Sequence, residues 1–347
     1  MMHGTALACS GCFGDHGLRM GAVKIGWQDD APCPNCGSQD GQKLDANRLM
    51  RLAYEFFVSG SQRKADFGQA PLIQFNFTSD QECSHCSYLS EDMGVFEDLV
   101  GIRFFDYGPR LWMIGENYPL QALVKGNAAK EMARIVDLYP SVKLTSFNRF
   151  YRLRINPEGT DDTAFDSPPL GVQGLGRFDS ANFPVMYASP DLQTCLHEMR
   201  VSVEDDVYAA LLKPIKDLKI LNLSVVVNDD KAEFESVDIG LYLIFMASAI
   251  GYNACRSLAA YLSGEGFDGI IYPSYFSHLR SGEIPFETSF GLSNRILPGH
   301  AEQESAKMIP NLALFGRPIE DGRIEVVSKN RVLLRKVDYE LLFGPVL

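Results

Sequence analysis

The sequence has no apolar run long enough to cross a membrane. Its longest such run, 239–252, is shorter than the roughly 20 residues that a spanning helix requires. The N-terminal residues include cysteines and charges where a signal peptide needs an uninterrupted apolar core. We therefore expect a cytoplasmic protein without a membrane partner.

Positive charge is also scarce. The chain has 32 lysines and arginines against 44 aspartates and glutamates, which gives a formal net charge of −12. A protein that binds a large nucleic-acid surface needs a basic face, so we do not expect nucleic acid as a substrate. This balance still allows a small basic pocket for one pyrophosphate.

Several familiar catalytic motifs are missing. The glycine-rich segment 171–176 lacks the Gly-Lys-[Ser/Thr] of a P-loop and the strand–turn–helix context of a dinucleotide fold. His197 and Glu198 would begin a zincin motif only with a histidine at position 201, which is Val201. No Gly-x-Ser-x-Gly elbow occurs either.

Cysteines, by contrast, follow a clear pattern, because six of the eight form three Cys-x-x-Cys pairs. In a reducing compartment this spacing indicates metal binding before disulfides. The first two pairs have the layout of a zinc ribbon, in which two turns supply four thiolates to one tetrahedral ion. We therefore predict a structural zinc site over 1–43 whose ligands are Cys9, Cys12, Cys33 and Cys36.

The third pair, Cys83 and Cys86, leaves two interpretations open. A zinc site needs four ligands, so a metal would require His85, His3 or His16, or a second copy of the chain in a homo-oligomer. Packed or exposed thiols without a metal explain the pair equally well.

The chain then changes in character twice. Residues 44–143 have helical spacing over 44–58 and 128–138 and a short strand pattern over 71–77, which predicts a small, mainly helical module. After residue 146, short apolar runs predict strands at 183–188, 207–212, 218–227, 269–273, 311–315 and 323–327. One or two helices broken near Gly251 are expected over 239–262, and 275–310 is a long polar loop or insertion.

The segment 183–202 is the centre of this second region. A strand over 183–188 leads into Ser189-Pro190-Asp191, a helix start with a capping hydroxyl, a proline at the first helical position and an acid in the first turn. Glu198 is then predicted at the flank of the apolar stripe, at the edge of a cleft. The stripe consists of Leu192, Cys195, Leu196 and Met199.

Several of these pieces together resemble the RES family, whose fold is related to ADP-ribosyltransferases. They are Tyr151-Arg152, GRF at 176–178, VMYASPDLQTCLHE at 185–198, GFDGIIYPS at 266–274 and NLALF at 311–315. The resemblance implies an α+β fold with an ADP-ribosyltransferase-like RES catalytic domain. We expect a zinc ribbon at 1–43, a helical accessory module at 44–143, the catalytic domain at 144–330 and a C-terminal tail at 331–347.

The resemblance further implies an enzyme that consumes NAD by cleaving the nicotinamide–ribose bond, through hydrolysis or phosphorolysis. Ordinary glycosidases need two carboxylates, one of which protonates the leaving group. Nicotinamide leaves from a cationic pyridinium, so one carboxylate that stabilises the developing cation suffices, and Glu198 is our candidate.

Arginines provide the forked donors that a pyrophosphate requires. Arg152 and Arg177 occupy the matching positions, with Arg154 as a possible substitute for the first, and Arg177 is also a candidate catalytic residue. The glycines of 171–176 would allow backbone amides to approach a phosphate closely.

The remaining candidates are two tyrosines and a serine. Tyr187 is expected to stack on nicotinamide or ribose, and Tyr151 is expected to take part in NAD binding beside the first arginine. Ser274 is expected to bond the nicotinamide amide or to orient Glu198, with Ser277 as a competing serine.

The resemblance also implies a toxin-like role, in a toxin–antitoxin pair or in phage defence, with an antitoxin as inhibitory partner or with control by the N-terminal modules. Two alternatives stay open. Transfer of ADP-ribose to a protein uses the same cation with another nucleophile. A non-catalytic zinc-ribbon adaptor would bind a nucleotide or a partner without turnover.

Overall fold

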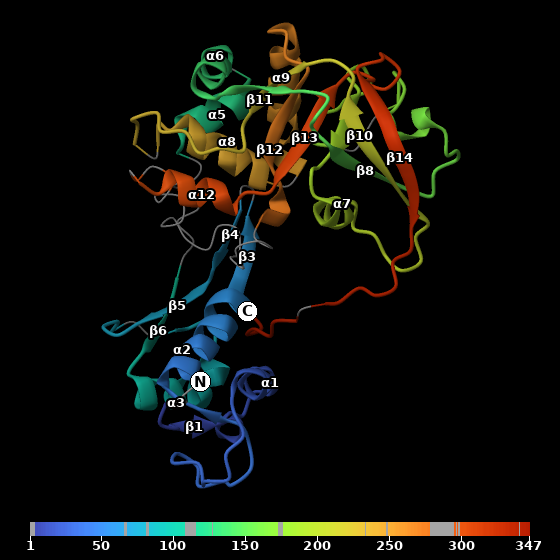
Figure 1. The fold of residues 1–347 in the computed structure, drawn as a ribbon. Coiled ribbons are helices and arrows are strands. Elements are labelled where there is room, and N and C mark those ends of the chain that lie inside the picture. The colour runs from blue at the N-terminus through green and yellow to red at the C-terminus, as the bar shows by residue number, and fades with distance from the viewer. Residues whose placement is uncertain are drawn as a thin grey trace.

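The computed structural model describes residues 4–65, 68–80, 83–107, 116–126, 128–172, 176–232, 234–247, 249–277, 295, 297, 299–339 and 341–347. These residues form two bodies, which lie one above the other in Figure 1. The N-terminal body holds residues 4–107, and the larger body holds 116–332. The segment 333–347 returns from the larger body to the N-terminal one, so both chain ends lie at the smaller body (Figure 1).

The N-terminal body combines helices with short antiparallel strand pairs. It is built around an aromatic core in which the Phe57 ring lies 4.4 Å from that of Phe104 and 5.9 Å from that of Phe96, between centroids. Its elements are β1 (Ala8–Cys9), α1 (His16–Ile25), β2 (Lys43–Leu44), α2 (Ala46–Ala53) with its π-helical extension (Tyr54–Val58), β3 (Gln62–Ala65), β4 (Gly68–Pro71), β5 (Ile73–Asn76), α3 (Ser90–Val100) and β6 (Arg103–Asp106).

The helix predicted over 44–58 is confirmed as α2 with its extension. It begins after Asp45, whose carboxylate accepts a hydrogen bond from the backbone N–H of Arg48 at 3.0 Å. This cap satisfies one of the N–H groups that a helix start leaves without a partner. Leu49 and Leu52 then bury their side chains in the aromatic core.

The larger body is a mixed α+β structure, as predicted. Its strands form two sheets, and helices pack against both of them. Its elements are α5 (Tyr118–Lys125), α6 (Ala129–Leu138), β7 (Ser141–Leu144), β8 (Phe150–Ile155), β9 (Val185–Ala188), α7 (Leu192–Met199), β10 (Val207–Pro214), β11 (Leu218–Asn222), α8 (Val237–Met246), α9 (Tyr252–Gly264), β12 (Gly269–Pro273), α12 (Ala301–Lys307), β13 (Pro310–Phe315) and β14 (Ile324–Val332).

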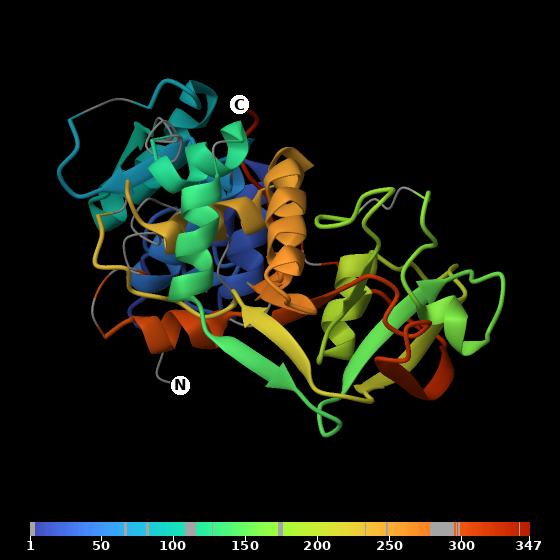
Figure 2. The same ribbon diagram turned by 90° about the horizontal axis from the view of Figure 1, so that it is seen from above.

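The helices α8 and α9, the five-stranded sheet and the three-stranded sheet make three layers, and α7 packs on the three-stranded sheet. The five-stranded sheet has the order β7-β11-β12-β13-β9, and the three-stranded sheet has the order β14-β10-β8. On β13, Ala313 and Phe315 face α8 and α9, whereas Leu312 and Leu314 face the three-stranded sheet. Successive side chains of a strand point to opposite faces, and both faces are covered here, so this strand is an almost continuous apolar run. Figure 2 shows the three-stranded sheet to one side of the helices.

The hydrophobic cores divide the chain differently from the predicted segments. Residues of the predicted ribbon and of α2, α3, β5 and β6 share one core. The helices α5 and α6, which fall inside the predicted accessory module 44–143, contribute to the core of the larger body through Leu120, Leu123, Met132 and Ile135. The structure therefore places the break between cores near residues 107–116.

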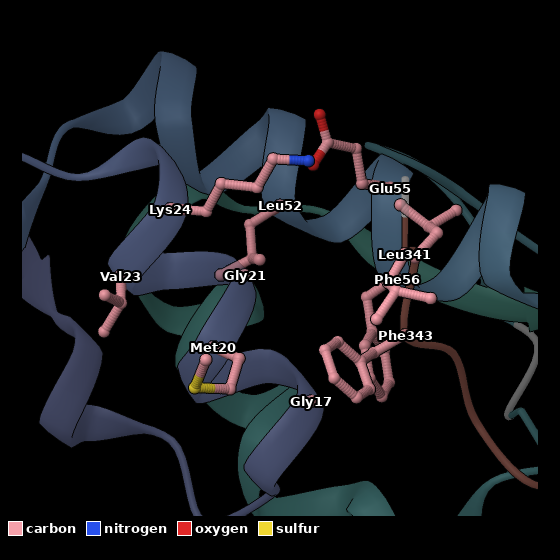
Figure 3. A pocket seen from close by; sticks show the side chains of 11 residues that line it. Gly17, Met20, Gly21, Val23, Lys24, Leu52, Glu55, Phe56, Leu341 and Phe343 are labelled. Carbon is pink, nitrogen blue, oxygen red and sulfur yellow. The ribbon is translucent and has the colours of Figure 1, made fainter. Parts of the chain in front are cut away.

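The C-terminal segment packs on the N-terminal body. Figure 3 shows Leu341 and Phe343 beside Phe56 at the rim of a cavity of about 330 Å³. A Cβ atom on Gly17 would lie 2.7 Å from the Cβ of Phe343, so only glycine permits this close approach. The backbone N–H of Val346 adds a 2.7 Å hydrogen bond to a tyrosine hydroxyl of the same body.

The predicted insertion 275–310 lies largely outside the described residues. Within it, the structure describes a 3-10 turn (Tyr275–Ser277), Arg295 and α12. Arg295 is 5% exposed and donates from Nε to Asp238 Oδ2 at 2.7 Å, with its guanidinium 4.2 Å from the centre of the Tyr242 ring. This buried ion pair fixes one point of the insertion on α8.

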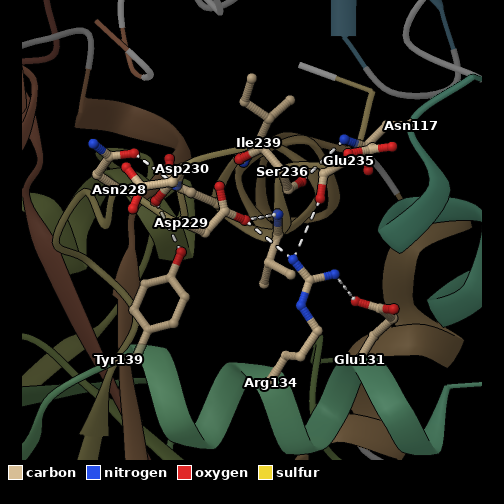
Figure 4. A network of polar contacts seen from close by, with 12 residues as sticks. Asn117, Glu131, Arg134, Tyr139, Asn228, Asp229, Asp230, Glu235, Ser236 and Ile239 are labelled. Atoms are coloured by element: carbon tan, nitrogen blue, oxygen red, sulfur yellow. Dashed lines mark hydrogen bonds and ion pairs between the residues drawn. The ribbon is translucent and has the colours of Figure 1, made fainter. Parts of the chain in front are cut away.

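Polar contacts also anchor the segment that leads into α8 (Figure 4). Arg134 of α6 lies 3.4 Å from the Asp229 carboxylate, which accepts the Val237 N–H at 2.8 Å. Asn117 donates to the Ser236 carbonyl at 3.0 Å. Across the described ranges, every helix is too short or too polar to cross a bilayer.

Candidate active site

A cavity of about 570 Å³ lies where the two sheets of the larger body meet. The sheets are linked there by a bridge between Tyr151 of β8 and Ser189, with N–H···O distances of 2.7 and 3.0 Å. The cavity wall is formed by β8, β9, α7, β12 and β13, by the ends of α8 and α9, and by the loop around residues 176–179. Residues far apart in the sequence thus converge on one space.

The helix α7 carries Glu198 to this cavity. Its start differs from the prediction, because the cap is Asp191 and not Ser189. The Asp191 carboxylate accepts from the Gln193 N–H at 2.9 Å and from the Thr194 hydroxyl at 2.8 Å. The Ser189 hydroxyl donates to the Pro310 carbonyl and accepts the Asp191 N–H, which precedes the helix, so the helical N–H group is left to the Asp191 carboxylate.

The predicted apolar stripe of α7 is partly confirmed. Leu192, Cys195 and Leu196 pack against the three-stranded sheet. Met199 is 41% exposed and lines the cavity instead. The stripe therefore fixes the helix on the sheet, and the flanking Glu198 lies exposed at the cavity wall.

Two neutral donors hold the Glu198 carboxylate. Ser274 Oγ donates to Glu198 Oε1 at 2.6 Å, and Asn311 Nδ2 donates to the same oxygen at 2.7 Å. Ser274 directly follows β12, and Asn311 lies on the neighbouring β13. Both hydrogen bonds that the structure describes for this carboxylate end on Oε1, so the side chain is oriented without being neutralised.

The competing serine has a different position. Ser277 Oγ donates to the Ser274 carbonyl at 2.7 Å and accepts from the Ile309 N–H at 3.0 Å. It therefore stabilises the turn after β12. Of the two serines, the structure brings Ser274 to Glu198.

Arg152 and Arg154 also line the cavity. Arg152 is 5% exposed and donates to the carbonyls of Tyr187 at 2.7 Å and Asp166 at 2.9 Å, while its buried Nε has no hydrogen-bond partner in the structure. Arg154 donates to the Ala164 carbonyl at 2.8 Å. Burial, and then the charge of Arg154, lower the pKa of Arg152 to about 9. Two cations thus lie side by side, bonded to carbonyls and not to carboxylates.

Arg177 lines the same cavity, but its guanidinium is bonded to the end of a helix. It donates to the Ile244 carbonyl at 2.7 Å and to the Ala247 carbonyl at 3.1 Å, and it lies 5.0 Å from the centre of the Tyr252 ring. These carbonyls belong to the last turn of α8, where the helix itself supplies no partner. The geometry gives Arg177 a structural role, and its predicted catalytic and pyrophosphate-binding roles stay predictions.

Tyr187 lines the cavity and is fixed by its hydroxyl. That oxygen accepts from the Phe178 N–H at 2.8 Å and donates to Asp179 Oδ1 at 3.0 Å. A Cβ atom on Gly176 would lie 2.4 Å from it, so glycine is required at this approach. In the glycine-rich segment, Gly176 therefore packs against the Tyr187 hydroxyl. Gly174 lies outside the described residues.

Tyr151 faces away from the arginines. Its side chain packs beside Leu192 and Leu196 of α7, on the face of β8 opposite to Arg152 and Arg154. Alternation along the strand explains this, because neighbouring side chains point to opposite faces. The described residues that line the cavity do not include Tyr151, and its predicted part in NAD binding stays a prediction.

Sequence reasoning missed two residues of the site, Asn311 and Tyr272. Asn311 was part of a predicted strand, where a buried amide within an apolar run was the only signal. Tyr272 lines the cavity near Glu198: burial, and then the negative charge of Glu198, raise the pKa of its hydroxyl.

The first two cysteine pairs form a separate cluster in the N-terminal body. Their four sulfur atoms all lie within 4.8 Å of one another. The Cys9–Cys36 and Cys12–Cys33 sulfur distances are both 3.6 Å. Four thiolates around a tetrahedral zinc at about 2.3 Å lie about 3.8 Å apart, so the donor set fits this ion. The predicted ribbon cluster is therefore confirmed as an arrangement of ligands.

Comparisons with known proteins give three findings. The family model for the RES domain matches residues 149–284. No curated protein matches the chain. A solved structure described as the M. tuberculosis MbcT–MbcA toxin–antitoxin complex is similar over 58% of this chain and 91% of that chain, with 15% sequence identity and a TM-score of 0.34.

Proposed function

Because residues 149–284 match the family model for the RES domain, we propose that this protein consumes NAD by cleaving the bond between nicotinamide and ribose. The RES domain supports a toxin-like role that acts on NAD in general, and the finer reaction is our inference. One observation carries it: an exposed carboxylate, Glu198, is held by two neutral donors at a cavity that is also lined by two arginines.

Glu198 suits a reaction in which positive charge develops on ribose. Its charge is not cancelled by an ion pair in the described structure, because both of its hydrogen-bond donors are neutral. A fixed negative charge beside a developing oxocarbenium ion lowers the barrier, and it costs no reorganisation when Ser274 and Asn311 already fix its position. Nicotinamide leaves as a neutral molecule and needs no acid.

Arg152 and Arg154 suit the pyrophosphate. In a chain of net charge −12, two adjacent guanidiniums place positive charge at the cavity. The hydrogen bonds described for them end on carbonyls, and the nearby Asp166 carboxylate favours the charged form of both. A bound dianion would favour the charged form of Arg152, whose pKa is lowered by burial and by Arg154. The cavity of about 570 Å³ is within the size range of small-molecule sites.

The ribbon cysteines are proposed to hold one structural zinc ion. A closed set of four thiolates leaves no open position for a substrate, so the ion would stabilise the N-terminal body and take no part in cleavage. Metal analysis of the purified protein should give one zinc per chain, and a Cys12→Ser variant should lose it together with thermal stability. A zinc content unchanged by that substitution would contradict the assignment.

The proposal is tested by following NAD loss and nicotinamide release. The variants are Glu198→Gln, which keeps shape and removes charge, and Glu204→Gln, a matched loss of charge on an exposed turn after α7. We expect the first to reduce kcat/KM at least ~10²-fold, about 2.7 kcal/mol, and the second to leave it within about threefold. Equal activity of wild type and Glu198→Gln would refute the assignment.

The same reactions identify the nucleophile. ADP-ribose indicates hydrolysis, its phosphorylated form in phosphate buffer indicates phosphorolysis, and label from NAD on a protein indicates ADP-ribosyl transfer. NAD binding without any turnover would favour the adaptor alternative. If an antitoxin or another inhibitory partner restrains the enzyme, it should co-purify and suppress turnover when added back.

A further inference from the structure

The third cysteine pair lies apart from both the cavity and the ribbon cluster. Cys83 and Cys86 occupy the turn before a 3-10 segment (Ser87–Leu89) and α3 in the N-terminal body. Their sulfur atoms are 3.3 Å apart. Cys83 is partly exposed, whereas Cys86 is buried and lies 3.6 Å from the Met93 sulfur. One thiol is thus accessible and the other is directly behind it.

A single carboxylate organises this turn. Asp106, at the end of β6, accepts from the Cys83 thiol at 3.3 Å and from the Ser84 N–H at 3.0 Å, and its Oδ1 lies 2.6 Å from His85 Nδ1. Burial opposes ionisation of Asp106, but the hydrogen bonds from Ser84 and His85 outweigh it and hold its pKa below the usual range. Asp106 therefore remains a carboxylate and holds the exposed thiol in a fixed position.

The pair differs from the ribbon cysteines in ways that disfavour a metal. Within the described ranges, the ribbon cysteines are the one group of three or more side chains that could hold a metal ion together, and their four sulfur atoms lie within 4.8 Å of one another. The sulfur separation of 3.3 Å is also shorter than the 3.6–4.0 Å found in the ribbon cluster. His85 and Asp106 lie beside the pair, but His85 Nδ1 is bonded to Asp106 Oδ1 at 2.6 Å, and these side chains do not form the closed four-ligand shell of structural zinc.

We propose that Cys83 and Cys86 form a reversible thiol–disulfide exchange site, with a low-molecular-weight disulfide as oxidant. The partly exposed Cys83 sulfur attacks one sulfur of that disulfide, and the first thiolate leaves. The Cys86 sulfur then attacks Cys83 in the mixed disulfide and releases the second thiolate. The two cysteine protons end on the two released thiols, so two thiols and one disulfide become one disulfide and two thiols.

The local geometry supports both steps. The sulfur atoms need to close from 3.3 Å to about 2.05 Å, a small movement within a four-residue turn at the surface. The hydrogen bond with Cys86, and then burial, raise the pKa of Cys83, so the first attack is expected to be the slower one, and exposure of Cys83 is what favours it. The same hydrogen bond lowers the pKa of Cys86, which favours the thiolate needed for the second attack. The other cysteines lack these features, because Cys195 and Cys255 are buried singly and the ribbon set matches a metal.

The test uses the full-length, zinc-loaded protein in glutathione buffers of stepped disulfide-to-thiol ratio. Remaining thiols are alkylated, and peptides are identified by mass spectrometry. We expect an intramolecular Cys83–Cys86 bond that forms and reverses with the ratio, while the ribbon cysteines stay unbridged and Cys195 and Cys255 stay reduced. A pair that remains fully alkylated at ratios that oxidise free dithiothreitol would overturn the proposal.

Two single variants examine the order of the steps. A Cys86→Ser variant should accumulate glutathione on Cys83, because the mixed disulfide has no resolving thiol. A Cys83→Ser variant should show at least tenfold less glutathione on the buried Cys86. The reverse pattern, or a second zinc per chain that disappears in both variants, would overturn the proposal, and the wild-type titration does not depend on how well either variant folds.

Discussion

Two carboxylates of the larger body have opposite surroundings. Asp238, at the first turn of α8, is 1% exposed and bonded by Arg295 at 2.7 Å and by the Tyr139 hydroxyl at 2.8 Å. Glu198 is exposed at the cavity and bonded by the neutral groups of Ser274 and Asn311. The charge of Asp238 is neutralised inside the protein, whereas the charge of Glu198 is held in position and remains accessible to a ligand.

This difference separates a structural carboxylate from a catalytic candidate. A buried charge needs an opposite charge and hydrogen bonds, since desolvation is costly. Arg295 supplies both the opposite charge and the hydrogen bonds, so Asp238 links the insertion to α8. Its negative charge is already neutralised and is not available to a ligand. The charge of Glu198 is not offset in this way, so it can respond to a cation that forms beside it.

The largest expected loss of stability comes from removing α5 and α6, the helices that pack in the core beside Asp238. A fragment 144–332 lacks α5, α6 and the Tyr139 hydroxyl, together with the buried Leu120, Leu123, Met132 and Ile135. Each large apolar side chain contributes roughly 1.5–3 kcal/mol, against a total stability of about 5–15 kcal/mol. Circular dichroism and size-exclusion chromatography should show 116–332 folded and 144–332 unfolded or aggregated; equal folding of both would contradict the core assignment.

Breaking the buried ion pair should have the next largest effect. Asp238→Asn leaves the Arg295 guanidinium buried without its counter-charge, and we expect about 3–5 kcal/mol of lost stability in urea unfolding. NAD cleavage at a temperature where the variant is folded should stay within about threefold of wild type. A loss below about 1 kcal/mol would show that this ion pair does not stabilise the fold.

Removing one donor to Glu198 should affect catalysis more than stability. In Asn311→Ala or Ser274→Ala the carboxylate loses one of its two hydrogen bonds, and kcat should fall roughly tenfold, about 1.4 kcal/mol. KM for NAD should change less than threefold, because neither donor is assigned to the pyrophosphate. Asn228→Ala, on a loop outside the cavity, is the matched control; a kcat equal to that control would refute the positioning role.

The smallest effect is expected at the Tyr139 hydroxyl. Tyr139→Phe removes one of the bonds to Asp238 while Arg295 remains, and burial together with Asp238 raises the pKa of this hydroxyl, so it is a donor throughout the physiological range. We expect about 1 kcal/mol of destabilisation and unchanged NAD cleavage. A loss of stability as large as that of Asp238→Asn would show that the tyrosine hydroxyl, and not Arg295, is the main stabilising partner of Asp238.

The sequence predicted sites whose residues are close together in the chain. The ribbon cysteines follow the spacing of two Cys-x-x-Cys pairs, so the sequence alone predicted that their four sulfur atoms lie together. The strands at 269–273 and 311–315 were found because burial on both faces makes them continuous apolar runs. The resemblance to the RES family supplied Glu198 and Ser274 as a pair.

Contacts set by strand register could not be predicted. Asn311 reaches Glu198 because β13 pairs with β12 in one register, with Asn311 opposite Tyr272. The bonds from Arg177 to the end of α8 depend on where that helix ends, and the sequence placed the break near Gly251, whereas α8 ends at Met246. The placement of α5 and α6 in the larger core likewise depends on tertiary packing.

The central claim is that the open carboxylate acts on the transition state and not on substrate binding. The most direct test measures NAD affinity by calorimetry and single-turnover nicotinamide release separately on wild type and Glu198→Gln. We expect the dissociation constant to remain within about fivefold while the release rate falls at least ~10²-fold. A release rate within threefold of wild type would contradict the account.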